Sequence, residues 1–139
     1  MGYCMEQRNS EFFIKKENFD KALVAIKALA NETKKMSGES SNGEHWFSWV
    51  DDYEFVEAKT LAEALTAWRW EPQLDEDGNI NDIFFNGEKL GDDFVLFEEI
   101  APFVKENSFI EMNGEDGTIW RWVFTDGICC KIPATISFG

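Results

Sequence analysis

Two tight-turn signals in the last third of the chain constrain its fold more than any other feature. The Gly-Glu-Asp-Gly run at 114–117 and the Asp-Gly pair at 126–127 separate three segments rich in β-branched and aromatic residues. Turns this short join antiparallel neighbours, whereas parallel strands need a long crossover. We therefore predict a β-meander with strands at 109–112, 118–125 and 128–136. Pro133 lacks a backbone donor, which places the last strand at a sheet edge or a bulge.

Two earlier segments have sequence signals of a helix. From Phe19 to Leu29 apolar residues recur every three or four positions, which is typical of an amphipathic helix. Asn18 is a candidate N-cap for this helix. Thr60 and Glu63 have the spacing of a capping box, in which the threonine hydroxyl accepts a backbone N–H of the first helical turn and the glutamate accepts the N–H of the cap residue itself. A second helix is therefore expected to begin there.

The remaining segments complete an α+β pattern. A third helix is expected to begin at Asp92 or Asp93 and to be kinked or split at Pro102, which cannot continue a helix without cost. Residues 51–57 read as acidic and irregular. Further extended segments are expected at 3–6, 11–14, 45–50, 70–74 and 80–85. Because hairpins dominate the later strands, we predict a mostly antiparallel sheet with two or three helices packed on one face, a two-layer sandwich.

The length and composition indicate one folded domain spanning residues 1–139. Hydrophobic residues make up 44% and aromatic residues 15% of the chain, far more than disordered chains contain. The polar stretch at 36–44 is predicted to be a mobile loop. It is not a domain linker, because the helix before it cannot bury its apolar stripe alone.

The net charge is strongly negative and is distributed unevenly along the chain. The net charge is −14, with +2 over residues 1–35 and −16 over residues 36–139. Such a surface repels phosphate groups, which argues against direct binding to nucleic acid or to an anionic membrane. It suits a basic protein partner, including a protein that itself binds nucleic acid. The alternative is that the charge serves solubility alone.

No catalytic or metal-binding motif is recognisable, so neither an enzyme nor a cofactor or metal site is predicted. The three cysteines, Cys4, Cys129 and Cys130, have neither CxxC nor Cys/His spacing, and free thiols fit a reducing cytoplasm. The N-terminus lacks the basic and apolar regions of a signal peptide. His45 is the only histidine, and nothing in the sequence brings it beside a cysteine for nucleophilic catalysis.

The acidic run at 75–79 invites comparison with a calcium-binding EF-hand loop. Aligning Gly78 with the invariant glycine of that loop puts Gln73 at the first ligand position and Phe84 at the last, where carboxylates are required. We therefore interpret the run as a hairpin turn. The many other paired carboxylates are interpreted as solvated surface.

The aromatic strands are the best candidates for an interaction surface. Alternation puts Trp120 and Trp122 on one strand face and Arg121 on the other, and both faces are apolar enough for an interior strand covered on each side. Arg121 then needs a carboxylate partner. Alternatively, Arg121 and the tryptophans line a recognition surface, because Trp and Arg are enriched in interface hot spots. Trp46 and Trp49, on the predicted 45–50 strand, belong to the same candidate surface, with core packing as their alternative.

Three segments together resemble small acidic proteins of phages, prophages and mobile elements. They are HWFSW at 45–49, APFV at 101–104 and GEDGTIWRWVF at 114–124. The resemblance implies a mobile-element origin and a bacterial cytoplasmic setting. It carries no catalytic or binding residues.

Two functions follow as hypotheses. The first is a non-enzymatic protein that presents an acidic face and the Trp/Arg sheet to a protein partner. The second is a small-ligand-binding protein or small enzyme with a pocket between helices and sheet.

Overall fold

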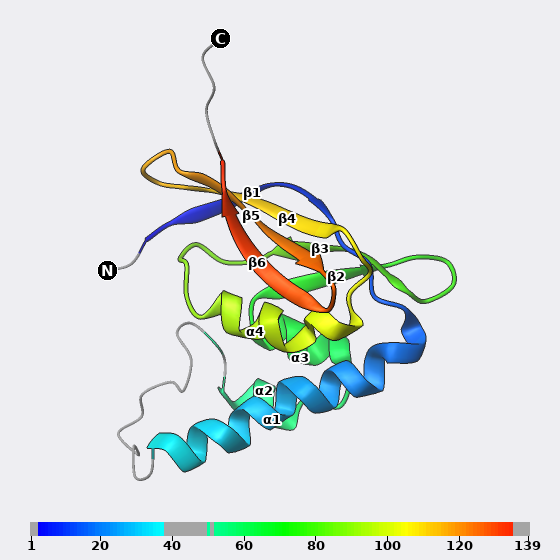
Figure 1. Cartoon of the computed structure of the whole chain (residues 1–139). Coiled ribbons are helices and arrows are strands. Elements are labelled where there is room, and N and C mark those ends of the chain that lie inside the picture. Colours follow the sequence, from blue (N-terminus) through cyan, green and yellow to red (C-terminus); the bar gives the residue numbers. More distant parts are fainter. Residues whose placement is uncertain (1–2, 38–49, 51, 135–139) are drawn as a thin grey trace.

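The computed structural model describes residues 3–37, 50 and 52–134, and these form an α+β fold (Figure 1). The strands are β1 (Met5–Glu11), β2 (Trp70–Leu74), β3 (Ile80–Phe85), β4 (Ser108–Gly114), β5 (Ile119–Thr125) and β6 (Ile128–Pro133). The α-helices are α1 (Phe19–Ser37), α2 (Asp52–Glu57), α3 (Leu61–Ala67) and α4 (Asp93–Ile100). Two 3₁₀ helices, η1 (Lys16–Asn18) and η2 (Ala101–Phe103), precede α1 and follow α4. Every strand pair is antiparallel, so the predicted α+β class is confirmed.

The larger sheet has four strands in the order β1-β4-β5-β6. Its last three strands are the predicted meander, and Pro133 lies on the edge strand β6, as expected. The prediction of separate extended segments at 3–6 and 11–14 is wrong. β1 runs from Met5 to Glu11 as one strand through the polar residues 8–10, and its register against β4 shifts between Gln7 and Asn9. A bulge of this kind accommodates an extra residue without ending the strand.

The β2–β3 hairpin forms a second, two-stranded sheet. The side chain of Gln7 links it to β1: Gln7 Nε2 donates to the Ile83 carbonyl at 2.8 Å, and the Phe85 N–H donates to Gln7 Oε1 at 2.7 Å. The predicted turn at 75–79 is confirmed, since the backbone N–H groups of Asp77 and Asn79 both donate to Asp75 Oδ1 at 2.9 Å. Partial desolvation of the Asp75 carboxylate raises its pKa. The hydrogen bonds that it accepts lower the pKa by more, so the pKa lies below its ordinary value.

The helices gather on one side of the four-stranded sheet (Figure 1). The predicted cap of α3 is confirmed, with Thr60 Oγ1 accepting from the Glu63 N–H at 3.1 Å. Glu63 accepts the N–H of Lys59 at 2.8 Å, one residue before the predicted N–H of Thr60. The split at Pro102 is also confirmed, because α4 ends at Ile100 and η2 follows.

The acidic segment before α3 has a different structure from the one predicted. Residues 52–57 form helix α2, although their composition suggested irregular structure. Phe55 is fully buried and Val50 nearly so, so burial of apolar side chains outweighs the local acidity. Residues 36 and 37, predicted to open a mobile loop, belong instead to α1, which reaches Ser37. Residues 38–44 of the predicted loop and 45–49 of the predicted strand lie outside the described residues.

The core between helices and sheets is built on aromatic rings. The ring of Phe97 lies 5.0 Å, centroid to centroid, from both Trp70 and Trp122. The indole N–H of Trp70 donates to the buried carboxylate of Asp93 at 2.9 Å. Arg69 Nη2 lies 3.2 and 3.1 Å from the two oxygens of that carboxylate, so the one buried charge among the described residues is paired. Within the described ranges no helix has the length and apolarity to cross a membrane.

Candidate interaction surface

The side of the four-stranded sheet that faces away from the helices, here called the outer face, is its most distinctive surface. On β5, Trp120, Trp122 and Phe124 turn toward the core and are each 1% exposed. The alternate residues turn outward, and Arg121 among them is exposed. The alternation was predicted correctly, but the expectation that both faces are covered is wrong. The helices pack on one face alone (Figure 1).

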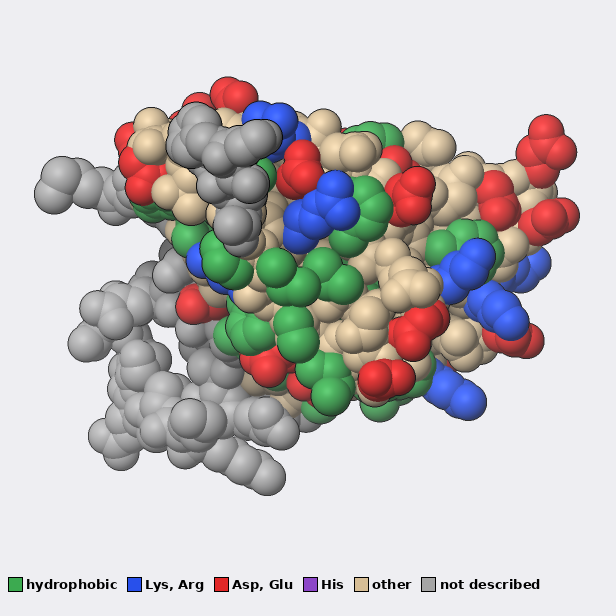
Figure 2. Space-filling view, turned by 45° about the horizontal axis from the view of Figure 1, so that its top comes forward, with side chains coloured by type: hydrophobic (Ala, Val, Ile, Leu, Met, Phe, Trp, Pro, Cys, Tyr) green, Lys and Arg blue, Asp and Glu red, His purple; other side chains and the backbone are tan. Residues whose placement is uncertain are grey.

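Apolar side chains occupy the outer face at an unusual density for a solvated sheet. The strand register puts Phe109 of β4, Val123 of β5 and Cys130 of β6 in one row across the sheet. Ile128 and Ile132 of β6 lie on the same side and are 58% and 50% exposed. Figure 2 shows hydrophobic side chains gathered on one face of the molecule, with charged side chains around them. An antiparallel sheet with one solvated face normally carries polar residues there.

A three-residue ion network crosses the centre of the outer face. Arg121 Nε donates to Glu111 Oε1 at 2.9 Å, and Arg8 Nε donates to Glu111 Oε2 at 3.1 Å. The guanidinium carbon of Arg121 also lies 4.1 Å from the centre of the Phe109 ring. The hydrogen bond from Arg121, assisted by Arg8, holds the pKa of Glu111 below its ordinary value. Two guanidinium groups thus share one carboxylate.

Acidic turns border this surface at both ends of the strands. The β4–β5 turn carries Glu115 and Asp116, and the Tyr3 hydroxyl donates to Asp116. At the other end Glu106 accepts the backbone N–H of Asp126 at 2.7 Å. Apolar side chains bordered by polar and charged ones are a common feature of protein–protein interfaces.

The site residues predicted from the sequence fall into three groups: core, outer face and residues that the structure does not describe. Trp120 and Trp122 belong to the core, so their proposed place on a recognition surface is corrected: the helices cover the strand face from which they project. Arg121 has the carboxylate partner that its position called for, and it lies on the outer face. Trp46 and Trp49 lie outside the described residues, as does His45.

Sequence reasoning missed three members of the outer face, Phe109, Glu111 and Ile132. A signal for Ile132 existed, because a two-residue turn at 126–127 fixes which residue of β6 lies opposite each residue of β5. Counting back from that turn pairs Ile132 with Arg121, as the structure does.

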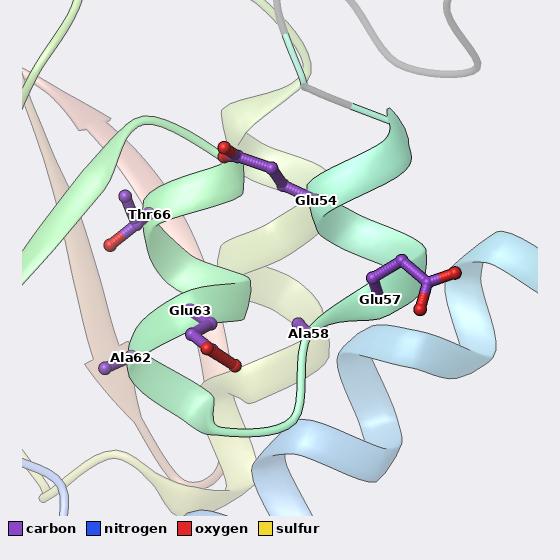
Figure 3. A pocket seen from close by; sticks show the side chains of 6 residues that line it. All are labelled: Glu54, Glu57, Ala58, Ala62, Glu63 and Thr66. Carbon is purple, nitrogen blue, oxygen red and sulfur yellow. The ribbon is translucent and has the colours of Figure 1, made fainter.

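A cavity of about 400 Å³ lies between α2 and α3 (Figure 3). Its lining combines three carboxylates with small side chains: Glu54, Glu57, Ala58, Ala62, Glu63 and Thr66. The small-ligand hypothesis expected a pocket between helices and sheet, whereas this cavity lies between two helices. Over residues 3–37, 50 and 52–134 no group of three or more His, Cys, Asp or Glu side chains is arranged to hold a metal ion.

Comparison of the chain with protein-family models, with curated proteins and with solved structures finds no match.

Proposed function

We propose that this protein is a non-enzymatic binding protein that docks a protein partner on the outer face of its four-stranded sheet. The observation that carries the proposal is the exposure of Ile128 and Ile132 on β6, which are 58% and 50% exposed. Ile132 lies opposite Arg121, whose guanidinium lies over the Phe109 ring. Arginine and aromatic side chains in an apolar setting are the usual anchors of an interface.

The partner in this proposal is basic. The chain carries a net charge of −14, and carboxylates border the apolar row at both ends of the strands. A partner with lysine or arginine around an apolar patch would match both features, and a nucleic-acid-binding protein is one such partner. On the strength of the segment resemblance described above, the proposed origin is a phage or mobile element and the proposed setting is the bacterial cytoplasm.

The experiment is affinity capture from bacterial lysate at low and at high salt, with three versions of the chain. Ile132→Ser removes an apolar anchor from the outer face, and Val24→Ser is the matched control because Val24 is 69% exposed on α1. We expect one stoichiometric partner that binds wild type and the Val24→Ser variant alike. Capture should weaken about tenfold for Ile132→Ser and should fall as salt rises. Equal capture by all three versions would contradict docking on the outer face.

Small-ligand binding is the second candidate, and the α2–α3 cavity is the feature that favours it. A volume near 400 Å³ is within the range of ligand pockets, and Glu54, Glu57 and Glu63 suit a cationic ligand. Thermal melting with a panel of small amines and guanidines tests this candidate. A shift that Glu57→Gln abolishes would support it, and a melting temperature that no compound changes would remove it.

A further inference from the structure

Cys4 and Lys89 form a side-chain pair across the outer edge of β1. The two residues are antiparallel bridge partners, and backbone hydrogen bonds of 2.8 and 2.7 Å flank them on either side. Lys89 Nζ lies 3.0 Å from Cys4 Sγ. Because backbone pairing fixes both Cα positions, the contact between thiol and amine is built into the fold.

The surroundings place a cation against the sulfur. The Lys89 ammonium contacts Cys4 Sγ, and peroxides oxidise a cysteine through its thiolate. The hydrogen bond to Cys4 raises the pKa of Lys89, which keeps the amine charged beside the sulfur. Both side chains are half-buried, so a small oxidant can reach the sulfur while bulkier thiols are hindered.

We propose that Cys4 and Lys89 are an oxidation-dependent cross-linking site, which reacts with hydrogen peroxide to close a covalent sulfur–nitrogen bond. The Cys4 thiolate attacks one peroxide oxygen, giving a sulfenic acid and hydroxide, so that sulfur is oxidised by two electrons and peroxide is reduced. The hydroxide takes a proton from the Lys89 ammonium and leaves as water. The free amine then displaces the sulfenic hydroxyl, which departs with an amine proton as a second water. Thiolate, ammonium and one peroxide thus give one sulfenamide and two waters.

The other two cysteines provide internal comparisons. Cys129 is buried, and burial raises its pKa to about 12, so it stays a protonated thiol. Cys130 is exposed, and in the described part of the chain no lysine amine is hydrogen-bonded to its sulfur. Among the described residues, only the Cys4 thiol combines solvent access with an amine in contact, so the cross-link is specific to that pair.

The cross-link would join the start of β1 to the segment between β3 and α4. The two residues are 85 positions apart, so the bond closes a long loop and restricts the unfolded chain strongly. Oxidation should therefore raise the thermal midpoint of the intact protein.

Mass spectrometry of the full chain after mild peroxide treatment tests the proposal. We expect a linked peptide pair containing Cys4 and Lys89 whose mass is about 2 Da below the sum of its parts, since two hydrogens are lost. Dithiothreitol should reverse it, and peroxide should raise the melting temperature of the wild type. Lys89→Arg keeps the positive charge but should abolish both the linked peptide and the melting shift, whereas Cys130→Ser should keep both.

Treatment of the urea-unfolded chain is the matched control, because there the backbone no longer holds the two side chains together. Linkage of equal yield in the unfolded chain would overturn the structural basis of the proposal. Oxidation of Cys4 to sulfinic acid without linkage, or a linked peptide that retains an oxygen, would overturn the condensation step.

Discussion

Arg121 and Glu111 lie directly opposite each other on β5 and β4, with Arg121 Nε 2.9 Å from Glu111 Oε1. The second oxygen of the same carboxylate accepts Arg8. The Glu111 side chain is 18% exposed, whereas those of Arg121 and Arg8 are 46% and 48% exposed. The carboxylate is therefore the most sheltered member of the network, and its protonation controls both ion pairs.

Glu111→Gln should lower stability in a pH-dependent way. The hydrogen bond from Arg121, then that from Arg8, lowers the pKa of Glu111 in the folded state from its ordinary value of 4.5. A lowered folded-state pKa adds stability above the unfolded value, and that stability is lost as pH falls through the folded-state value. The free energy of unfolding of the variant should be lower by less than about 1 kcal/mol at neutral pH, because both arginines are exposed. Urea unfolding followed by tryptophan fluorescence measures it.

The difference between wild type and Glu111→Gln should shrink steadily below pH 4.5. Glu6→Gln is the control, since Glu6 is exposed on β1 of the same sheet and forms no ion pair within the described ranges. That variant should track the wild type at every pH. A deficit of Glu111→Gln that persists unchanged into acid would show that the ion pairs are not its cause.

Local signals in the sequence predicted local structure well. The β4–β6 meander, the cap at Thr60 and the break at Pro102 each depend on a few neighbouring residues, and all three are found. Helix α2 could not be predicted in the same way. It depends on burial of Phe55, which packs edge-to-face on Trp68 at 5.5 Å, a contact that exists only after α2 and α3 meet.

The candidate site was harder to predict for a related reason. Alternation along β5 separates Trp120 and Trp122 from Arg121, but alternation does not say which face the helices will cover. The connections between the strands decide which face of the sheet the helices cover. The outer-face role of Arg121 and the burial of the two tryptophans therefore emerge only from the assembled fold.

Gln7→Ala should weaken the link between the two sheets. Its side-chain amide donates to the Ile83 carbonyl and accepts from the Phe85 N–H, and no backbone ladder replaces these bonds at that place. Leaving both partners unpaired should cost about 1–3 kcal/mol of unfolding free energy. Gln73→Ala is the matched control, because Gln73 is exposed on β2. Equal loss in the two variants, measured by urea unfolding, would contradict a linking role for Gln7.

Thr60→Ala should destabilise the start of α3. The lost Oγ1 acceptor leaves the Glu63 N–H without its cap, at a cost of about 1 kcal/mol. Thr60→Ser keeps a hydroxyl and should lie within about 0.5 kcal/mol of the wild type. Thermal melting monitored by circular dichroism compares the two variants. A serine variant as unstable as the alanine variant would mean that the threonine methyl group, and not the cap, matters.

Asp93→Asn should be the most damaging of these substitutions. The Asp93 carboxylate is buried and accepts from Arg69, from the Trp70 indole and from the Gly91 N–H. Asparagine keeps one acceptor but leaves the guanidinium of Arg69, whose side chain is 14% exposed, without a counter-charge.

Removing one partner of a buried ion pair typically costs about 3–5 kcal/mol, so the urea midpoint of Asp93→Asn should fall far below that of the wild type. Asp77→Asn, the same chemical change on the exposed β2–β3 turn, should stay within about 0.5 kcal/mol. The double variant Asp93→Asn with Arg69→Met removes the stranded charge and should recover part of the loss. If Arg69→Met in this background gave no recovery, the cost would instead come from the acceptors that Trp70 and Gly91 lose, and the ion pair would not be the main reason for burying Asp93.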